Sequence, residues 1–193
     1  MIPAISATAL CRVYRDQVAL DDISLTIETG TITGLLGRNG AGKTTLLRIL
    51  SGLEFPTAGD IRVFGQRPAE NEAVLRRMVF VREEQPYPDF CVGAVIRVAS
   101  WFYPNWDRDF AERLLEDFEL PARRRIKKLS RGMRSAVGIV IGLASRAELT
   151  LFDEPVRWPG RGGTPALLRQ AARRFRRTSS DHRAVNAPNR RGS

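Results

Sequence analysis

Residues 37–44 constrain the fold of this chain more than any other segment. They read GRNGAGKT, a complete match to the pattern Gly-x-x-x-x-Gly-Lys-[Ser/Thr]. Glycines allow positive φ angles, so several backbone N–H groups can turn inward and hold phosphate oxygens. The pattern predicts a phosphate-binding loop with a Lys at the β and γ phosphates and a hydroxyl ligand for Mg²⁺, built from Gly37, Arg38, Asn39, Gly40, Ala41, Gly42, Lys43 and Thr44.

The sequence around this loop supplies the elements that a phosphate loop requires. Residues 23–37, ISLTIETGTITGLLG, contain two short β-type runs separated at Thr29 and Gly30. After the loop, Leu46, Leu47, Ile49 and Leu50 recur at helical spacing. We therefore predict strand, loop and helix in succession, a context that a simple glycine-rich turn would lack.

The rest of the chain, up to about residue 155, alternates between strand and helix signals. Residues 59–65 (GDIRVFG), 78–81 (MVFV) and 149–152 (LTLF) are β-type runs, the last two short and mainly apolar. Residues 92–147 are dominated by helical periodicity, as in DRDFAERLLEDFEL and SAVGIVIGLA. This order predicts an α/β fold with a mainly helical insertion at 92–147.

Two adjacent carboxylates, Asp153 and Glu154, follow the apolar run at 149–152. An acidic pair at a strand end is often only a solvated end. In a chain with a phosphate loop, however, the first carboxylate can hold the Mg²⁺ of a bound nucleotide and the second can polarise the attacking water.

The cysteine content indicates a reducing compartment, and the net charge comes mostly from one segment of the chain. The two cysteines, Cys11 and Cys91, have no metal-ligand spacing, and we expect no secretory signal and no membrane span. The net charge is +10, but residues 156–193 contain ten Arg and one acidic residue, which leaves only +1 for residues 1–155. The basic excess therefore says nothing about the surface of the folded part.

These motifs together resemble the ATP-binding subunits of ABC transporters. The segment LLGRNGAGKTTLLRILSGLEFPTAGDIRVFG resembles the Walker A region of that family, LTLFDEP resembles its Walker B strand, and LSRGM resembles its signature motif, which is usually Leu-Ser-Gly-Gly-Gln. The similarity covers residues 4–155. It implies an α/β P-loop NTPase with a RecA-like core, an antiparallel β part and a helical subdomain at 92–147, incomplete at its C-terminal end.

The resemblance also implies roles for individual residues. Tyr14 would stack on adenine, although an ordinary strand aromatic is the alternative. Thr45 would assist Thr44, Asp153 would bind Mg²⁺ and Glu154 would be the general base. The signature would face the γ phosphate of ATP held by a second, head-to-tail subunit, and it comprises Leu129, Ser130, Arg131, Gly132 and Met133, of which Arg131 and Met133 depart from the family pattern.

Two further positions depart from the family pattern. Glu83 occupies the place of the usual magnesium-sensing Gln, with Gln85 nearby; an oxygen ligand for Mg²⁺ and a solvated acidic loop are both open interpretations. The only histidine, His182, follows a stretch that cannot be a buried strand, so we interpret it as a solvated tail residue and not as the family's switch histidine.

Residues 156–193 stop resembling the family abruptly. We predict a mostly disordered Arg-rich tail. Read one base out of frame, its codons permit Gly-Leu-Asp directly after the Walker B region and, later, Leu-Ile-Ile-Val-Leu-Ser-Thr-His, both of which the family carries there. A one-base insertion near codon 157 would explain the change, and a genuine basic arm that binds nucleic acid or anionic lipid is the less favoured alternative.

The resemblance as a whole implies an ATP-binding subunit of an ABC transporter with ATP and Mg²⁺ as cofactors. It would lie in the cytoplasm on the inner face of the cell membrane, with membrane-spanning permease subunits and a second ATP-binding subunit as partners. The stretch SWFYPNWD resembles one in bacterial exporter-type ATPases of drug or peptide efflux, and this resemblance favours an exporter. Since part of the family pattern is missing, we expect weak activity, and a non-hydrolysing nucleotide-binding fragment is the alternative function.

Overall fold

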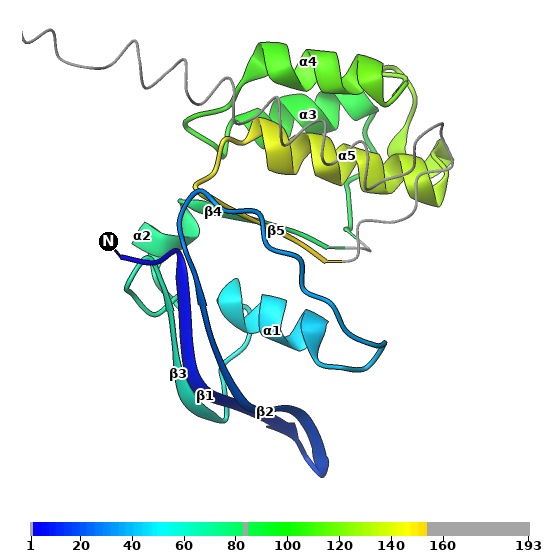
Figure 1. Cartoon of the computed structure of the whole chain (residues 1–193). Coiled ribbons are helices and arrows are strands. Elements are labelled where there is room, and N and C mark those ends of the chain that lie inside the picture. Colours follow the sequence, from blue (N-terminus) through cyan, green and yellow to red (C-terminus); the bar gives the residue numbers. More distant parts are fainter. Residues whose placement is uncertain (1, 83–84, 154–193) are drawn as a thin grey trace, which may run out of the picture.

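A computed structural model describes residues 2–82 and 85–153 of the chain. These residues form two sheets and a helical layer (Figure 1). The expected α/β class is confirmed. The predicted tail at 156–193 lies outside the described residues.

The first sheet is antiparallel and has the order β2-β1-β3, from β1 (Ile5–Tyr14), β2 (Gln17–Ile27) and β3 (Ala58–Val63). Strands β1 and β2 form a hairpin whose last pair is Tyr14 and Gln17. Inward-facing apolar residues such as Leu10, Leu20 and Val63 are buried against the first helix, α1 (Lys43–Leu50).

The second sheet is parallel and pairs β4 (Met78–Val81) with β5 (Leu149–Phe152) in register from Met78 and Leu149 to Val81 and Phe152. Short, mainly apolar strands suit this position because both faces of a parallel sheet are covered by helices. The strands expected at 59–65, 78–81 and 149–152 are therefore confirmed.

Helices cover both faces of this parallel pair (Figure 1). On one face α1 packs through Leu46, Ile49 and Leu50 into the core that also holds Met78 and Leu151. On the other face lies α5 (Arg131–Ala144), and a Cβ atom at Gly142 would come within 2.9 Å of the Phe152 ring. Strand β5 is thus held between two helices and its carboxyl end is fixed.

The helical layer contains α3 (Val92–Ser100), α4 (Arg108–Asp117), a short 3-10 helix η1 (Ile126–Lys128) and α5. Its core is formed by residues such as Phe110, Leu114 and Val137. A single-turn helix, α2 (Glu72–Leu75), precedes β4. In the described part of the chain, no helix combines the length and the hydropathy needed to cross a bilayer.

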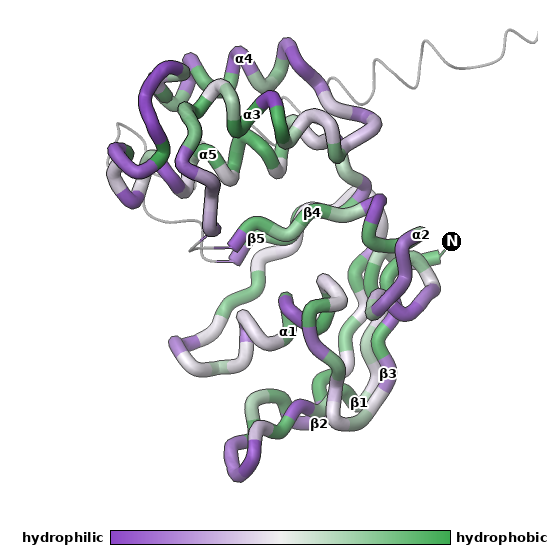
Figure 2. The backbone as a smooth tube through the Cα atoms, turned by 180° about the vertical axis from the view of Figure 1, so that it is seen from behind, coloured by the Kyte–Doolittle hydropathy of each residue, from purple (hydrophilic) through white to green (hydrophobic). Residues whose placement is uncertain are grey.

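One predicted strand is wrong. Residues 31–37 form no strand, and Ile32 and Leu36 are 68% and 94% exposed. Figure 2 shows this segment running from the end of β2 past β5 to the start of α1. Strands are held by hydrogen bonds to a neighbouring strand, and within residues 2–82 and 85–153 β5 pairs with β4 alone. Residues 31–37 therefore have the side-chain pattern of a strand, but they have no partner strand among the described residues.

Candidate phosphate and magnesium site

The site is built where β5 ends and α1 begins. The hydrogen-bond ladder of β4 and β5 continues one residue past β5, because the N–H of Asp153 donates to the carbonyl of Val81 at 2.9 Å. This bond fixes Asp153, which is 9% exposed. The Thr44 hydroxyl donates to Asp153 Oδ1 at 3.1 Å. Two side chains that are 109 residues apart in the sequence are therefore in direct contact.

The loop before α1 has the backbone that its glycines predict. Gly40 and Gly42 have φ values of 81° and 80°, and the Ala41 N–H donates to the Arg38 carbonyl at 3.1 Å. Strand β2 lies tightly against the loop, since a Cβ atom at Gly42 would be 2.2 Å from the Ala19 carbonyl oxygen. Glycine is required at position 42 both for its conformation and for this close approach.

The first turn of α1 offers backbone N–H groups that the helix does not pair internally. Gly42 is the N-cap and provides no side-chain cap, and the first intrahelical bond runs from the Leu46 N–H to the Gly42 carbonyl at 2.9 Å. The N–H groups of Lys43, Thr44 and Thr45 therefore have no acceptor within the helix. Together with the positive end of the helix dipole, they suit an anion such as phosphate.

The Lys43 side chain folds back over the loop. Its Nζ donates to the carbonyl of Gly37 at 2.9 Å and to the carbonyl of Arg38 at 3.0 Å. The ammonium group is thus held at the loop, where it can exchange carbonyl oxygens for phosphate oxygens.

The two oxygen groups of Thr44 and Asp153 fit Mg²⁺, which prefers hydroxyl, carboxylate and phosphate oxygens. No cluster of three or more His, Cys, Asp or Glu side chains occurs among the described residues.

Tyr14 lies at the tip of the β1–β2 hairpin and is 37% exposed. Its hydroxyl donates to the carboxylate of Glu54, and the guanidinium carbon of Arg12 lies 4.5 Å from its ring centroid. The sequence predicts no role for Arg12 or for Glu54, although Glu54 lies within the segment that resembles the Walker A region. Only the tertiary contacts reveal them.

The residues of the LSRGM motif lie at the start of α5. Leu129 is buried, and the Ser130 oxygen caps the helix by accepting from the Met133 N–H at 3.2 Å. Arg131 is exposed, while Gly132 is partly buried. Helices α1 and α5 lie on opposite faces of the β4–β5 pair in both ribbon views (Figures 1 and 2). The fold therefore does not bring this motif to the chain's own phosphate loop.

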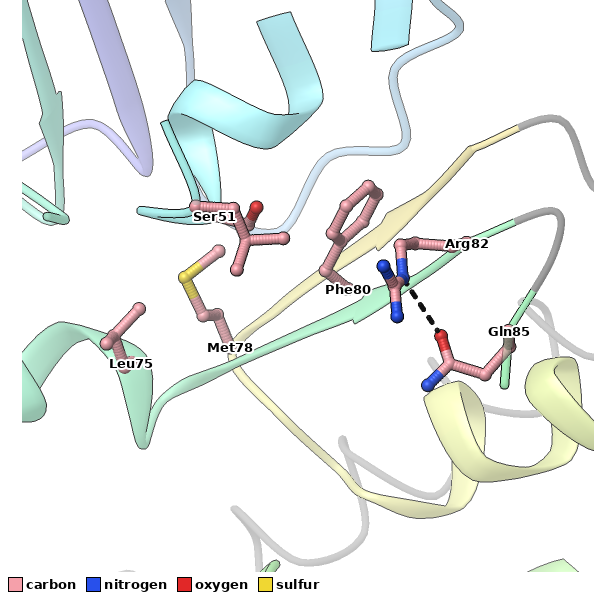
Figure 3. A pocket seen from close by; sticks show the side chains of 7 residues that line it. Ser51, Leu75, Met78, Phe80, Arg82 and Gln85 are labelled. Atoms are coloured by element: carbon pink, nitrogen blue, oxygen red, sulfur yellow. Dashed lines mark hydrogen bonds between the residues drawn. The ribbon is translucent and has the colours of Figure 1, made fainter. Parts of the chain in front are cut away.

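Three predicted residues, Glu83, Glu154 and His182, lie outside the described residues. Gln85 is described, and its Oε1 accepts from Arg82 Nε at 3.5 Å. Both line a cavity of about 280 Å³ beside β4 that also includes Ser51, Met78 and Phe80 (Figure 3). Ser51 follows the C-terminal end of α1, about 12 Å along the helix from the loop. The cavity is therefore not the phosphate site.

Comparison with known proteins places these features in one family. A family model described as "ABC transporter" matches residues 20–157. The chain is 34% identical over 137 residues to the ABC transporter ATP-binding protein YtrB of Bacillus subtilis (strain 168), covering 70% of this chain and 47% of YtrB. It is 38% identical over 161 residues to the phosphonates import ATP-binding protein PhnC 1 of Natronomonas pharaonis, covering 79% of this chain and 69% of PhnC 1.

A solved structure described as the ATP-binding subunit of an ABC transporter superposes with a TM-score of 0.76 at 26% identity. The superposition covers 90% of this chain and 75% of that structure. The chain thus shares the fold but spans only about half the length of YtrB.

Proposed function

Because the chain belongs to the ABC transporter family, we propose that it is an ATP-binding subunit that couples MgATP binding and hydrolysis to transport across a membrane. The observation that carries this proposal is the 3.1 Å hydrogen bond between Thr44 and Asp153. It joins the phosphate loop to the acidic strand end, which is the pair of groups that a Mg²⁺-nucleotide requires.

Each group has a definite task in nucleotide binding. The N–H groups at the start of α1 and the ammonium of Lys43 bind the β and γ phosphates. Thr44 and Asp153 would hold a magnesium ion, which would neutralise phosphate charge. Glu154 orients and polarises the attacking water. Hydrolysis of this kind depends mainly on positioning and charge stabilisation.

The position of α5 supports a head-to-tail dimer. Ser130 and Gly132 belong to the start of α5, and α5 lies across the β4–β5 pair from α1 (Figure 1). A single chain therefore cannot apply its signature residues to its own nucleotide, whereas a second subunit can present them from outside. Tyr14 stacks on the adenine of the same chain, and Glu83 contributes an oxygen ligand near the magnesium ion.

We assign the helical layer to contact with membrane-spanning permease subunits, on the cytoplasmic face of the membrane. Trp101 and Phe102, at the end of α3, are 74% and 75% exposed and supply apolar surface for such a contact. The stretch SWFYPNWD, which contains both aromatics, favours export, although PhnC 1 is named as an import protein. Transport assays with the cognate permease in vesicles of both orientations distinguish the two directions.

We further propose that turnover by this chain is weak, or absent in the alternative of a non-hydrolysing fragment. The exposed segment at 31–37, which pairs with no described strand, supports this. Loss of one preorganised polar contact costs about 10² to 10³ in rate. ATPase activity equal to that of an intact subunit would contradict the proposal. Sequencing the gene across codons 150 to 193 tests whether a one-base insertion produced the Arg-rich tail.

Binding and turnover are tested with four variants of the full chain. Lys43→Ala should weaken ATP binding about 10-fold or more, because it removes a charge-assisted phosphate contact. Lys128→Ala makes the same change at an exposed lysine and should have no effect. Asp153→Asn should weaken binding only in the presence of Mg²⁺. Equal affinities for Lys43→Ala and Lys128→Ala would refute the phosphate site.

Glu154→Gln separates the two function classes. If the chain hydrolyses ATP, this variant should lose turnover and keep ATP bound. If the chain is a non-hydrolysing fragment, the unaltered protein should show no turnover and the variant should not differ from it. Calorimetric ATP binding and phosphate release, measured on the same samples, give both readouts.

A further inference from the structure

Resting on the nucleotide site proposed above, we propose that Glu54 is a positioning residue that fixes the ring of Tyr14 relative to the phosphate-binding end of α1. The two side chains are 40 residues apart in the sequence and meet through the Tyr14 hydroxyl, which donates to the Glu54 carboxylate. Glu54 touches no reacting atom and acts only through the aromatic ring.

The backbone around Glu54 is held at both ends. The Leu53 N–H donates to the carbonyl of Arg48 in α1 at 2.9 Å, and the Thr57 N–H donates to the carbonyl of Cys11 in β1 at 2.8 Å. The segment that carries Glu54 therefore bridges the helix that begins at the phosphate loop and the strand that ends at Tyr14.

The Glu54 carboxylate joins three side chains. Arg48 Nε lies 2.9 Å from Oε1, while Arg12 Nε lies 3.8 Å from Oε2, the oxygen that accepts from Tyr14. The Glu54 side chain is only 13% exposed, against 49% for Arg48. Its interactions are consequently less screened by water and salt than those of an exposed ion pair.

Arg12 covers one face of the Tyr14 ring, with its guanidinium carbon 4.5 Å from the ring centroid. Guanidinium groups stack on aromatic faces. A nucleotide base therefore stacks on the opposite face. Arg12 and Glu54 together hold the ring in one plane, so that little rotational freedom is lost when the base binds.

The contacts from Arg48 through Glu54 to Tyr14 link the aromatic ring to α1, and they should affect the affinity for ATP. Because α1 carries the phosphate-binding groups at its other end, the aromatic ring and those groups belong to one rigid unit. Removing Glu54 should weaken recognition of the base and leave recognition of the phosphates unchanged.

The experiment compares the binding of MgATP and of inorganic pyrophosphate with Mg²⁺ to the full chain, by calorimetry. Glu54→Ala should weaken MgATP binding about 2- to 10-fold, the range that one hydrogen bond contributes, without changing pyrophosphate binding. Tyr14→Phe keeps the ring and removes only the hydroxyl, so it should reproduce the same selective loss. Tyr14→Ala should cost at least about fivefold in MgATP affinity, because base stacking is lost.

The double variant Tyr14→Ala with Glu54→Ala should bind MgATP no more weakly than Tyr14→Ala alone. A purely structural role for Glu54 predicts the opposite, namely an equal loss for ATP and pyrophosphate that persists when Tyr14 is absent. Glu112→Ala, which breaks the exposed pair with Arg108 on α4, is the charge-matched control and should change neither affinity.

Three results would overturn the positioning role. They are an equal loss for both ligands in Glu54→Ala, an additive loss in the double variant, and unchanged MgATP affinity in Tyr14→Phe. If the unaltered chain binds neither MgATP nor pyrophosphate, the proposed nucleotide site itself fails and the role of Glu54 falls with it. If Glu54→Ala does not fold, the MgATP affinity of Tyr14→Phe still tests the positioning role of Glu54.

Discussion

Replacing Gly42 with Ala tests how the phosphate loop is held in the fold. Gly42 has a φ of 80°, and the Cβ atom of an alanine there would lie 2.2 Å from the Ala19 carbonyl oxygen and 2.7 Å from Leu20 Cδ2. Both distances are far below van der Waals contact. Because Ala19 belongs to β2, the loop and the strand cannot separate without disturbing the first sheet.

The magnitude follows from two contributions. A left-handed alanine costs about 1–2 kcal/mol, offset by about 0.4–1 kcal/mol because alanine reduces the entropy of the unfolded chain. Forcing a methyl group into a filled space costs a further 1–3 kcal/mol, approximately. Gly40 has a φ of 81° but nothing within 4 Å of its Cβ position. Gly40→Ala should therefore have only the net cost of a left-handed alanine, without the cost of a steric clash.

The assay is thermal and urea unfolding of both variants, followed by circular dichroism. Gly42→Ala should be less stable than Gly40→Ala by about 1–3 kcal/mol, or about 2–12 °C in Tm for a chain of this size. Gly42→Ala should also weaken ATP binding, because the start of α1 has to shift. Equal destabilisation by the two variants would refute the close approach of β2 to the loop.

Three further predictions concern the metal site and the helical layer. Thr44→Ala and Asp153→Asn should each reduce the Mg²⁺-dependent part of ATP affinity about 10-fold or more, measured by calorimetry with Mg²⁺ and with EDTA. Burial alone would raise the pKa of Asp107, but hydrogen bonds from Arg146 lower it below its ordinary value. The stability from this pair is therefore present above the unfolded pKa of about 4, and it is lost as the pH falls through the folded pKa of Asp107. Asp107→Asn should lower the free energy of unfolding by about 1–3 kcal/mol at pH 7 and by less in acid. Urea unfolding at several pH values measures this difference. The Tyr87 hydroxyl is buried without a hydrogen-bond partner among the described residues, so Tyr87→Phe should leave Tm unchanged or raise it, and a clear decrease would reveal a partner.

The sequence predicts the local parts of this protein well. The pattern at 37–44 predicts the phosphate loop, because glycine adopts the positive φ of Gly40 and Gly42 without a steric cost. The apolar runs at 78–81 and 149–152 identify β4 and β5, because a fully buried strand has apolar side chains on both faces. These features depend on neighbouring residues in the chain and can be found without the fold.

Residues 31–37 show where such prediction fails. Their β-type pattern is as clear as that of β5, but they form no strand in the structure. A strand depends on a hydrogen-bonding neighbour, which its own residues cannot specify. The side-chain pattern therefore indicates what the segment could form, and the surrounding sheet decides whether it does.

The sequence by itself determined the α/β fold, and it predicted which residues would bind phosphate and Mg²⁺. Only the tertiary structure decided which of them meet. It placed Thr44 against Asp153 across 109 residues, and it brought Arg12 and Glu54 into contact with Tyr14. It also put α5, whose first residues carry the LSRGM motif, on the opposite side of the β4–β5 pair from α1 (Figure 1). Such contacts depend on how strands and helices pack, since side chains far apart in the sequence come together only when the chain folds.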